Sequence, residues 1–209
     1  MLRLFILLVL FAQTFVVWSQ DFLHEGDLLF CVSSKGNAIT DVTQGIDGSL
    51  IDHVGIVHRA NDSIFVLEAI HKGVVLSPLD SFLVSNDSLV IVARLRDTTG
   101  VASSVNRAMR YLGRPYDFLF MPDDSAMYCS ELVQKTYRNG AGHALFGTIP
   151  MSFHDTTGAV TPYWKEYYAR RGKNVPEGEP GSNPGQLSRS KKIRILGRFK
   201  DLCSSQLRR

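Results

Sequence analysis

The residue with the most distinctive chemical setting in this chain of 209 residues is Cys129, one of three cysteines. It opens the segment 129–138 (CSELVQKTYR), whose composition predicts a helix that ends at Asn139-Gly140. The free N–H groups and the dipole at the start of a helix favour negative charge, and therefore a reactive thiolate. Such a thiolate attacks carbonyl carbons, and neighbouring N–H groups hold the resulting oxyanion. Because most lone cysteines are small buried apolar residues, this chemistry also requires a base.

A base is available in His53, the best placed of the six histidines. It begins the alternating segment 53–58 (HVGIVH), which predicts a strand, and Gly55 on the same face leaves room beside its ring. An imidazole titrates near neutral pH and can take the proton of a thiol. Cys129 and His53 together therefore predict nucleophilic catalysis by a thiol.

Glu68 is the candidate to orient that imidazole. Alternation in the next predicted strand, 64–69 (IFVLEA), places it on an otherwise apolar face, where an unpaired carboxylate is costly. Adjacent strands lie about 4.8 Å apart, so the carboxylate can accept the imidazole N–H of His53. The sequence leaves a second interpretation open, in which Glu68 pairs with an arginine such as Arg59 or Arg94.

Short strands and two helices must position these residues. Apolar or alternating runs predict strands over 28–32, 53–58, 64–69, 73–77, 89–95 and 193–199. Helical spacing predicts helices over 101–112 and 129–138. Residues 33–52 are expected to form a loop or short helix over a cleft, and the Gly- and Pro-rich residues 172–188 a surface loop. The pattern predicts one α+β domain with a mostly antiparallel sheet of five or six strands.

Five phrases along the chain carry a family resemblance. They are GDLLF (26–30), DHVGIVHR (52–59), VLEA (66–69), GRPYDFLF (113–120) and YCSELV (128–133). In this order they resemble the permuted papain-like branch of the NlpC-type cysteine peptidases, the YiiX/YebB-like family, and residues 175–190 resemble its C-terminal region. The resemblance implies a circularly permuted papain-like fold. In that fold a mostly antiparallel sheet or half-barrel packs on helices, one of which carries the cysteine at its amino end.

Carried over residue by residue, the resemblance implies a Cys-His-Glu triad. Cys129 would be the nucleophile, His53 the general base and Glu68 the orienting group, with the histidine preceding the cysteine as in this family. Tyr116 matches a tyrosine whose hydroxyl is implicated at the oxyanion site of the relatives. The alternative for Tyr116 is a half-buried side chain with a solvated hydroxyl.

Three residues next to the triad are expected to contact substrate, namely Asp52, Tyr128 and Ser130. Tyr128 and Glu131 replace the aspartate and the glycine of the DCSGLV phrase found in unpermuted relatives. Asp52 stands where relatives commonly carry serine, and an extra carboxylate there is expected to raise the pKa of His53.

Residues 1–19 have the pattern of a signal peptide. Arg3 precedes an apolar run, and Val17 and Ser19 fit the small residues of a cleavage site. Cleavage after Ser19 predicts a hydrolase domain over 20–209, exported to the periplasm or the extracellular space, with no stable membrane span. An uncleaved anchor is the alternative.

The charge distribution disfavours a nucleic-acid partner. The formal net charge is +3, but residues 21–188 hold 14 basic and 19 acidic residues, a net charge of −5. Eight basic residues lie from Arg189 onward, where a solvated terminal strand is expected. No cofactor is expected. The lack of HExxH and CxxC motifs, with His58 on the opposite strand face from His53, disfavours a metal site.

Two further features have two interpretations each. Cys31 and Cys203 form a disulfide or are both reduced. Four aromatic residues spaced for one helix face lie in the core or in the wall of a substrate cleft, namely Tyr163, Trp164, Tyr167 and Tyr168.

The expected substrate follows from the resemblance. It implies hydrolysis of an amide bond in a cell-wall peptide, peptidoglycan fragments included, or in a small N-acyl amino-acid amide. One alternative is a lipid acyl hydrolase or acyltransferase on the same fold, as in the lecithin-retinol-acyltransferase relatives. The other is a non-catalytic binding domain that kept the cleft.

Overall fold

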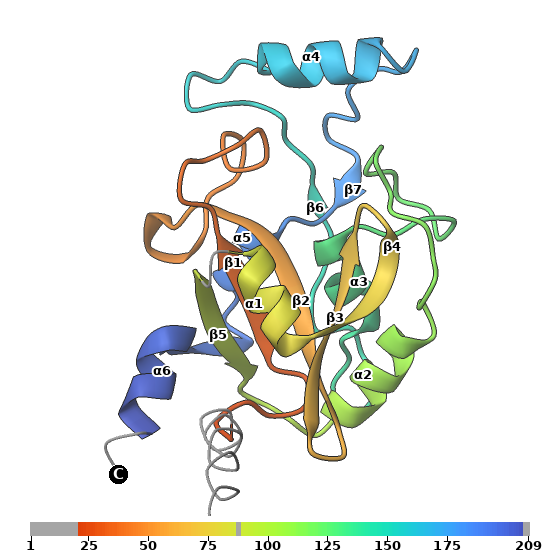
Figure 1. Ribbon diagram of the computed structural model, residues 1–209. Helices are drawn as coiled ribbons and strands as arrows, with labels where there is room; N and C mark the ends of the chain where they lie inside the picture. The colour runs from red at the N-terminus through yellow and green to blue at the C-terminus, as the bar shows by residue number, and fades with distance from the viewer. Residues whose placement is uncertain (1–20, 87–88, 207–209) are drawn as a thin grey trace, which may run out of the picture.

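A six-stranded antiparallel sheet, in the order β4-β3-β2-β1-β5-β8, forms the centre of the computed structural model (Figure 1). The structure describes residues 21–86 and 89–206, so the predicted signal peptide lies outside the described residues. The strands are β1 (Leu28–Val32), β2 (Ile51–Ala60), β3 (Ser63–Ile70), β4 (Gly73–Pro78), β5 (Val90–Leu95) and β8 (Ile193–Arg198). No helix among these residues is long and apolar enough to cross a membrane.

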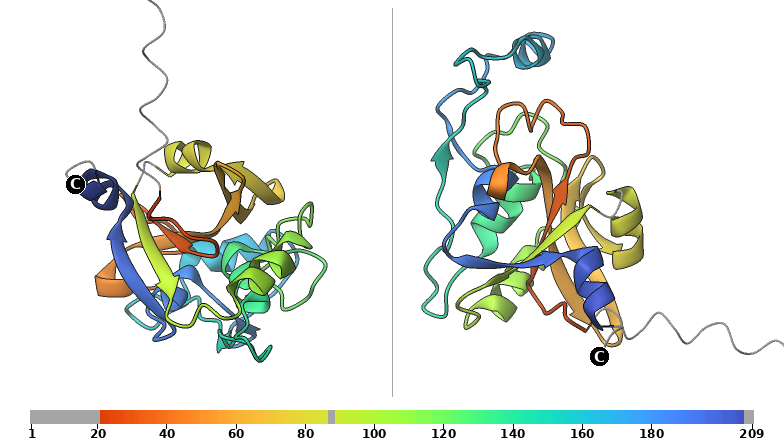
Figure 2. Two further views of the ribbon diagram at one scale, coloured as in Figure 1. Left: turned by 90° about the horizontal axis from the view of Figure 1, so that it is seen from below. Right: turned by 90° about the vertical axis from the view of Figure 1, so that its left-hand side faces the viewer.

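Both faces of the sheet are covered by helices, because the apolar residues of the strands alternate between two cores. α2 (Val101–Met109), α3 (Cys129–Thr136) and α5 (Pro184–Ser188) pack on one face. α1 (Leu79–Ser85) and α6 (Phe199–Gln206) pack on the other, as Figure 2 shows from two directions. The predicted α+β architecture with a mostly antiparallel sheet is confirmed.

α4 (Pro162–Ala169) lies beyond one end of the sheet (Figure 1). The chain reaches it after β6 (Ile149–Pro150) and returns through β7 (Pro180–Gly181), and these two strands pair with each other. A third apolar cluster joins this helix to the body. Its buried members are Met151, Phe153, Trp164 and Tyr168, and residues of the 33–50 and 117–122 segments pack against them.

Two sequence-based expectations were wrong. Residues 172–188 do not form only a surface loop, since β7 and α5 lie within them and Gly185 contacts the backbone of Gln44. Asn183 caps α5 by accepting the Gln186 N–H, and Pro184 supplies its first turn, so the Gly- and Pro-rich composition here encodes a helix start. The basic tail is not one terminal strand either, because it turns into α6 after β8.

The start of β1 is fixed by a buried ion pair. Asp27 is fully buried, and its two carboxylate oxygens accept hydrogen bonds from Nε and Nη2 of Arg94 on β5, both at 2.7 Å. The preceding Gly26 has φ 71°, and its carbonyl accepts a hydrogen bond from the Tyr137 hydroxyl at 2.8 Å. Asp27 thus binds β1 to β5, and Gly26 binds β1 to the residue that follows α3, the helix that begins at Cys129.

Replacing Arg94 with alanine is expected to destabilise the protein strongly, because it leaves the Asp27 carboxylate buried without its cation. Loss of one partner of a buried pair costs about 3 kcal/mol or more. Chemical denaturation followed by circular dichroism measures the change in the free energy of unfolding. The matched control is Arg170→Ala, which removes an exposed pair with Glu166 and should cost about 0.5 kcal/mol or less. Equal losses in the two variants would contradict the structural role of Asp27.

Candidate active site

Cys129 is the first residue of α3, as the sequence predicted. The helix is held by Leu132 and Val133, which are buried in the same core as the sheet strands, and by Tyr137 just beyond its end. Cys129 itself is 6% exposed. The thiol is therefore fixed at the amino end of a helix that cannot shift against the sheet.

The structure brings His53 and Glu68 together. Nε2 of His53 lies 2.7 Å from Oε2 of Glu68, across the β2–β3 pair. Ser77 on β4 donates a hydrogen bond to the other oxygen, Oε1, at 2.6 Å. Both carboxylate oxygens are therefore occupied, and the imidazole is held in one orientation.

Within the part of the chain that the structure describes, neither Arg59 nor Arg94 pairs with Glu68. Arg59 donates its backbone N–H to Glu25 and its guanidinium to the Leu23 carbonyl. Arg94 is bound to Asp27. Ser77 was missed in the sequence, because only the register of the β3–β4 hairpin brings it beside Glu68.

The electrostatic setting of His53 favours the imidazolium. Burial alone lowers its pKa, but hydrogen bonds with Cys129 and Glu68, together with their negative charges, raise it to about 10. Cys129 and Glu68 make the largest contributions that raise this pKa, and Asp52 is not among them.

Asp52 occupies an irregular position in the sheet. Cys31 pairs with His53 and Val32 pairs with Ile51, so Asp52 has no partner on β1. Its Oδ2 accepts a hydrogen bond from Nδ2 of Asn37 at 2.5 Å. The sequence singled out Asp52, but Asn37 was missed because it lies in the irregular 33–50 segment.

Tyr128 and Ser130, on either side of Cys129, are tied to the segment that follows β7. The Tyr128 hydroxyl accepts the Ser182 N–H at 3.1 Å, and the hydroxyls of Ser130 and Ser182 lie 3.1 Å apart. Both residues are buried, and both line the cleft described below. The segment that was taken for a surface loop thus braces the start of α3.

Tyr116 lies on the same cleft. Burial raises the pKa of its phenol strongly, and the negative charge of a Cys129 thiolate adds to the effect. Its ring packs edge-on against Phe118, with the centroids 4.9 Å apart. The hydroxyl therefore stays protonated and can donate a hydrogen bond in the cleft.

Glu131 caps α3 from within the helix. It is buried, and its carboxylate accepts the Tyr128 N–H at 3.4 Å and lies 2.7 Å from Nζ of Lys135. Burial raises its pKa to about 7, although Lys135 opposes the shift. Because Lys135 also binds Asp124 at 2.6 Å, this cluster ties the loop before Cys129 to the helix.

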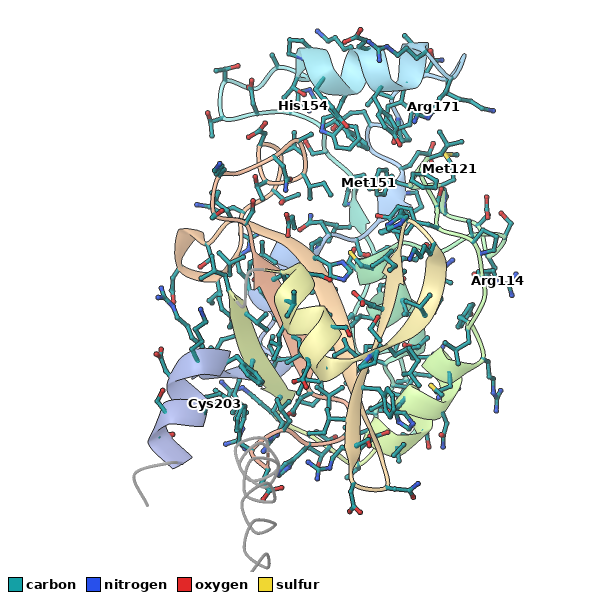
Figure 3. The ribbon with its side chains drawn as sticks, in the orientation of Figure 1. Arg114, Met121, Met151, His154, Arg171 and Cys203 are labelled. Atoms are coloured by element: carbon teal, nitrogen blue, oxygen red, sulfur yellow. The ribbon has the colours of Figure 1, made fainter. Side chains whose placement is uncertain are left out.

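A cleft of about 530 Å³ opens beside the thiol. Its lining is mostly apolar, and Met151 marks the place in Figure 3, between the body and α4. The lining residues are Ile39, Val42, Thr43, Asp52, Tyr116, Phe120, Tyr128, Cys129, Ser130, Met151, Ser152, Phe153, Trp164, Ser182, Asn183 and Pro184. The four aromatic residues of α4 were expected either in the core or in the cleft wall, and each expectation holds in part. Trp164 is buried in an apolar cluster and also lines the cleft, whereas Tyr163 is exposed.

The other two cysteines are separate from this chemistry. Cys31 and Cys203 are not joined by a disulfide, so the disulfide interpretation is wrong. Burial raises the pKa of each of these thiols, well above the ordinary range for Cys31. Such protonated thiols are poor nucleophiles.

The geometry agrees with the comparisons to known proteins. A family model described as "Permuted papain-like amidase enzyme, YaeF/YiiX, C92 family" matches residues 22–196. The chain belongs to this family. Its members are cysteine hydrolases of the peptidase and amidase type, so the fold and the family predicted from the five phrases are confirmed.

Two relatives of this chain come from Escherichia coli. The protein YiiX of strain K12, described as uncharacterized, is 30% identical over 189 residues, covering 87% of this chain and 88% of its own length. The crystal structure of the "metalloprotein yiiX" of strain O157:H7 aligns with a TM-score of 0.69 and 28% identity, over 83% of this chain and 96% of that one. Among the described residues of this chain, no group of three or more His, Cys, Asp or Glu side chains is arranged to hold a metal ion.

His53→Ala is expected to slow alkylation of Cys129 by iodoacetamide about tenfold or more at pH 6.5, because an unassisted thiol is only about 1% ionised there. Quantitative mass spectrometry of the Cys129 peptide over time gives the rate. His58→Ala is the matched control, since His58 lies on the same strand and has a similar contact with Glu25 at 3.0 Å. Equal rates in the wild type and His53→Ala would contradict the ion pair.

The stability contributed by His53 should depend on pH. Its folded pKa of about 10 lies above the ordinary value of 6.5, so the stabilisation is fully present below pH 6.5 and is lost as the pH rises through 10. The difference in the free energy of unfolding between the wild type and His53→Gln should therefore shrink from pH 6 to pH 10. In a Glu68→Gln background the stabilisation by His53 should be lost at lower pH, because the carboxylate that raises its pKa is absent. A stability difference between the wild type and His53→Gln that does not change with pH would contradict the raised pKa of His53.

Proposed function

We propose that the protein is an exported cysteine amidase that cleaves an amide bond through an acyl-enzyme on Cys129. The proposed base is His53, oriented by Glu68, and the substrate is a cell-wall peptide or a small N-acyl amino-acid amide. The observation that carries the proposal is the 2.7 Å contact of His53 with Glu68, with Cys129 at the start of α3 contributing to the raised pKa of that imidazole. This arrangement supports the assignment of a base, its orienting carboxylate and a nucleophile.

The proposed reaction has two halves. The Cys129 thiolate attacks the amide carbonyl carbon and a C–S bond forms, while N–H groups at the start of α3 and the Tyr116 hydroxyl stabilise the oxyanion. The imidazolium of His53 gives its proton to the leaving nitrogen, and the C–N bond breaks. His53 then takes a proton from water, which attacks the thioester to release the acid and restore the thiol.

The apolar lining of the cleft supports a second candidate function. Ile39, Val42, Phe120, Met151 and Trp164 offer an acyl chain a surface away from water. The second candidate is therefore a lipid acyl hydrolase or acyltransferase that uses the same thiol. A non-catalytic binding domain is the third, and the alkylation rate of Cys129 separates it from both.

The hydrolysis test compares muropeptides, N-acyl amino-acid amides and acylated lipids as substrates for the wild type and Cys129→Ala. Amine release from the amides, with a thioester adduct on the Cys129 peptide, supports the amidase. Acyl-chain release from the lipids supports the second candidate. His53→Ala should lower kcat about a hundredfold or more, as expected for loss of a general base. Turnover that persists in Cys129→Ala would overturn both hydrolase proposals.

Export is proposed from the amino-terminal pattern alone. Mass spectrometry of the protein recovered from producing cells should find a chain that begins at Gln20, outside the cytoplasm. Recovery of the chain starting at Met1 in the cytoplasm would contradict the proposed export.

A further inference from the structure

Asp52 has a position that the proposed catalytic steps do not use. It is the extra residue in the β1–β2 ladder, because the residues before and after it, Ile51 and His53, pair with consecutive residues of β1. Such bulges redirect a side chain and are common beside active sites. Here the redirected carboxylate lines the cleft together with Cys129.

A dedicated contact holds the Asp52 carboxylate. The side-chain oxygen of Asn37 accepts the N–H groups of Ile39 and Thr40 at 3.0 and 3.2 Å, which points its amide nitrogen at Asp52. Asn37 donates to Oδ2 only, and the described residues provide no hydrogen bond to Oδ1. One carboxylate oxygen therefore remains available to a molecule in the cleft.

No cation of the protein neutralises this carboxylate within the cleft. Of the described residues that line it, none is lysine, arginine or histidine. The imidazole of His53, next in sequence, is engaged by Glu68 and Cys129 instead. The Asp52 carboxylate is half-buried at the edge of a mostly apolar lining. A carboxylate that is partly removed from water attracts a cation more strongly than a fully solvated one, because the local dielectric is lower.

We infer that Asp52 binds a primary ammonium group of the substrate, while an apolar group beside it occupies the cleft. This inference rests on the proposed function, because the amide of that substrate must reach Cys129. An α-ammonium group lies one carbon from the carbonyl of its own residue, which suits a carboxylate next in sequence to the base. The substrate is thereby narrowed to an apolar aminoacyl amide with a free amine, such as a peptide with an unblocked amino end.

Calorimetric binding tests the inference without turnover. The protein carries Cys129→Ala, which removes the nucleophile, and the two ligands are phenylalaninamide, which is cationic, and N-acetylphenylalaninamide, which is neutral. The cationic amide should bind with a Kd about tenfold lower or more, as expected for one hydrogen bond to a charged group. Adding Asp52→Asn should reduce the preference to about twofold or less, the range expected for a neutral hydrogen bond.

The matched control is Asp41→Asn, which removes an exposed carboxylate of the same loop that does not line the cleft. It should keep the full preference for the cationic amide. Equal binding of the two amides, absence of binding by both, or a preference that survives Asp52→Asn would overturn the inference. The outcome is distinguishable from failure of the proposed function, which shows as unassisted alkylation of Cys129 and absence of hydrolysis.

Discussion

The imidazole of His53 is held by the carboxylate of Glu68, and the rest of the candidate site depends on this contact. The 2.7 Å separation from Glu68 requires β2 and β3 to keep one register, since a slip of one residue would turn Glu68 to the opposite face. Gly55 is also required for this register of β2 and β3. A Cβ there would lie 2.3 Å from the Val66 side chain, so only glycine lets the two strands carry His53 and Glu68 at this spacing.

The thiol has to meet that imidazole from a different part of the chain. α3 reaches the sheet because Leu132 and Val133 are buried against it, while the Tyr137 hydroxyl binds the Gly26 carbonyl at the other end. Gly26 is in turn next to Asp27, whose ion pair with Arg94 fixes β1 to β5. The ion pair that anchors β1 therefore also supports the Gly26 carbonyl to which the end of α3 is bound.

Local pattern was sufficient to predict much of this arrangement. Alternation in β2 and β3 placed His53 and Glu68 on one face, and the expected starts of β1 and α3 agree with the structure. Side chains that contact the site from distant segments of the chain could not be recognised from local alternation or helix spacing. Ser77, Asn37 and Ser182 are short polar residues whose roles depend on strand register and loop folding, which propensity does not encode. The error over 172–188 has a related cause, because Gly and Pro occur both in exposed loops and in closely packed turns that begin a helix.

The acidic side chains near the cleft differ in whether a basic side chain compensates their charge. The cationic imidazole of His53 is bound to the Glu68 carboxylate, and Glu131 lies buried two residues beyond Cys129 on α3. Glu131 is compensated by Lys135, and Glu68 by His53 and Ser77, so each of these carboxylates has a fixed structural partner. Asp52 has only a neutral amide. The remaining negative charge would repel a carboxylate close to the scissile bond, and it would attract an amine. Among the described residues that line the cleft, Asp52 is the only aspartate, glutamate, lysine, arginine or histidine, so the bulge that leaves it unpaired on the sheet accords with the inferred preference for an amine.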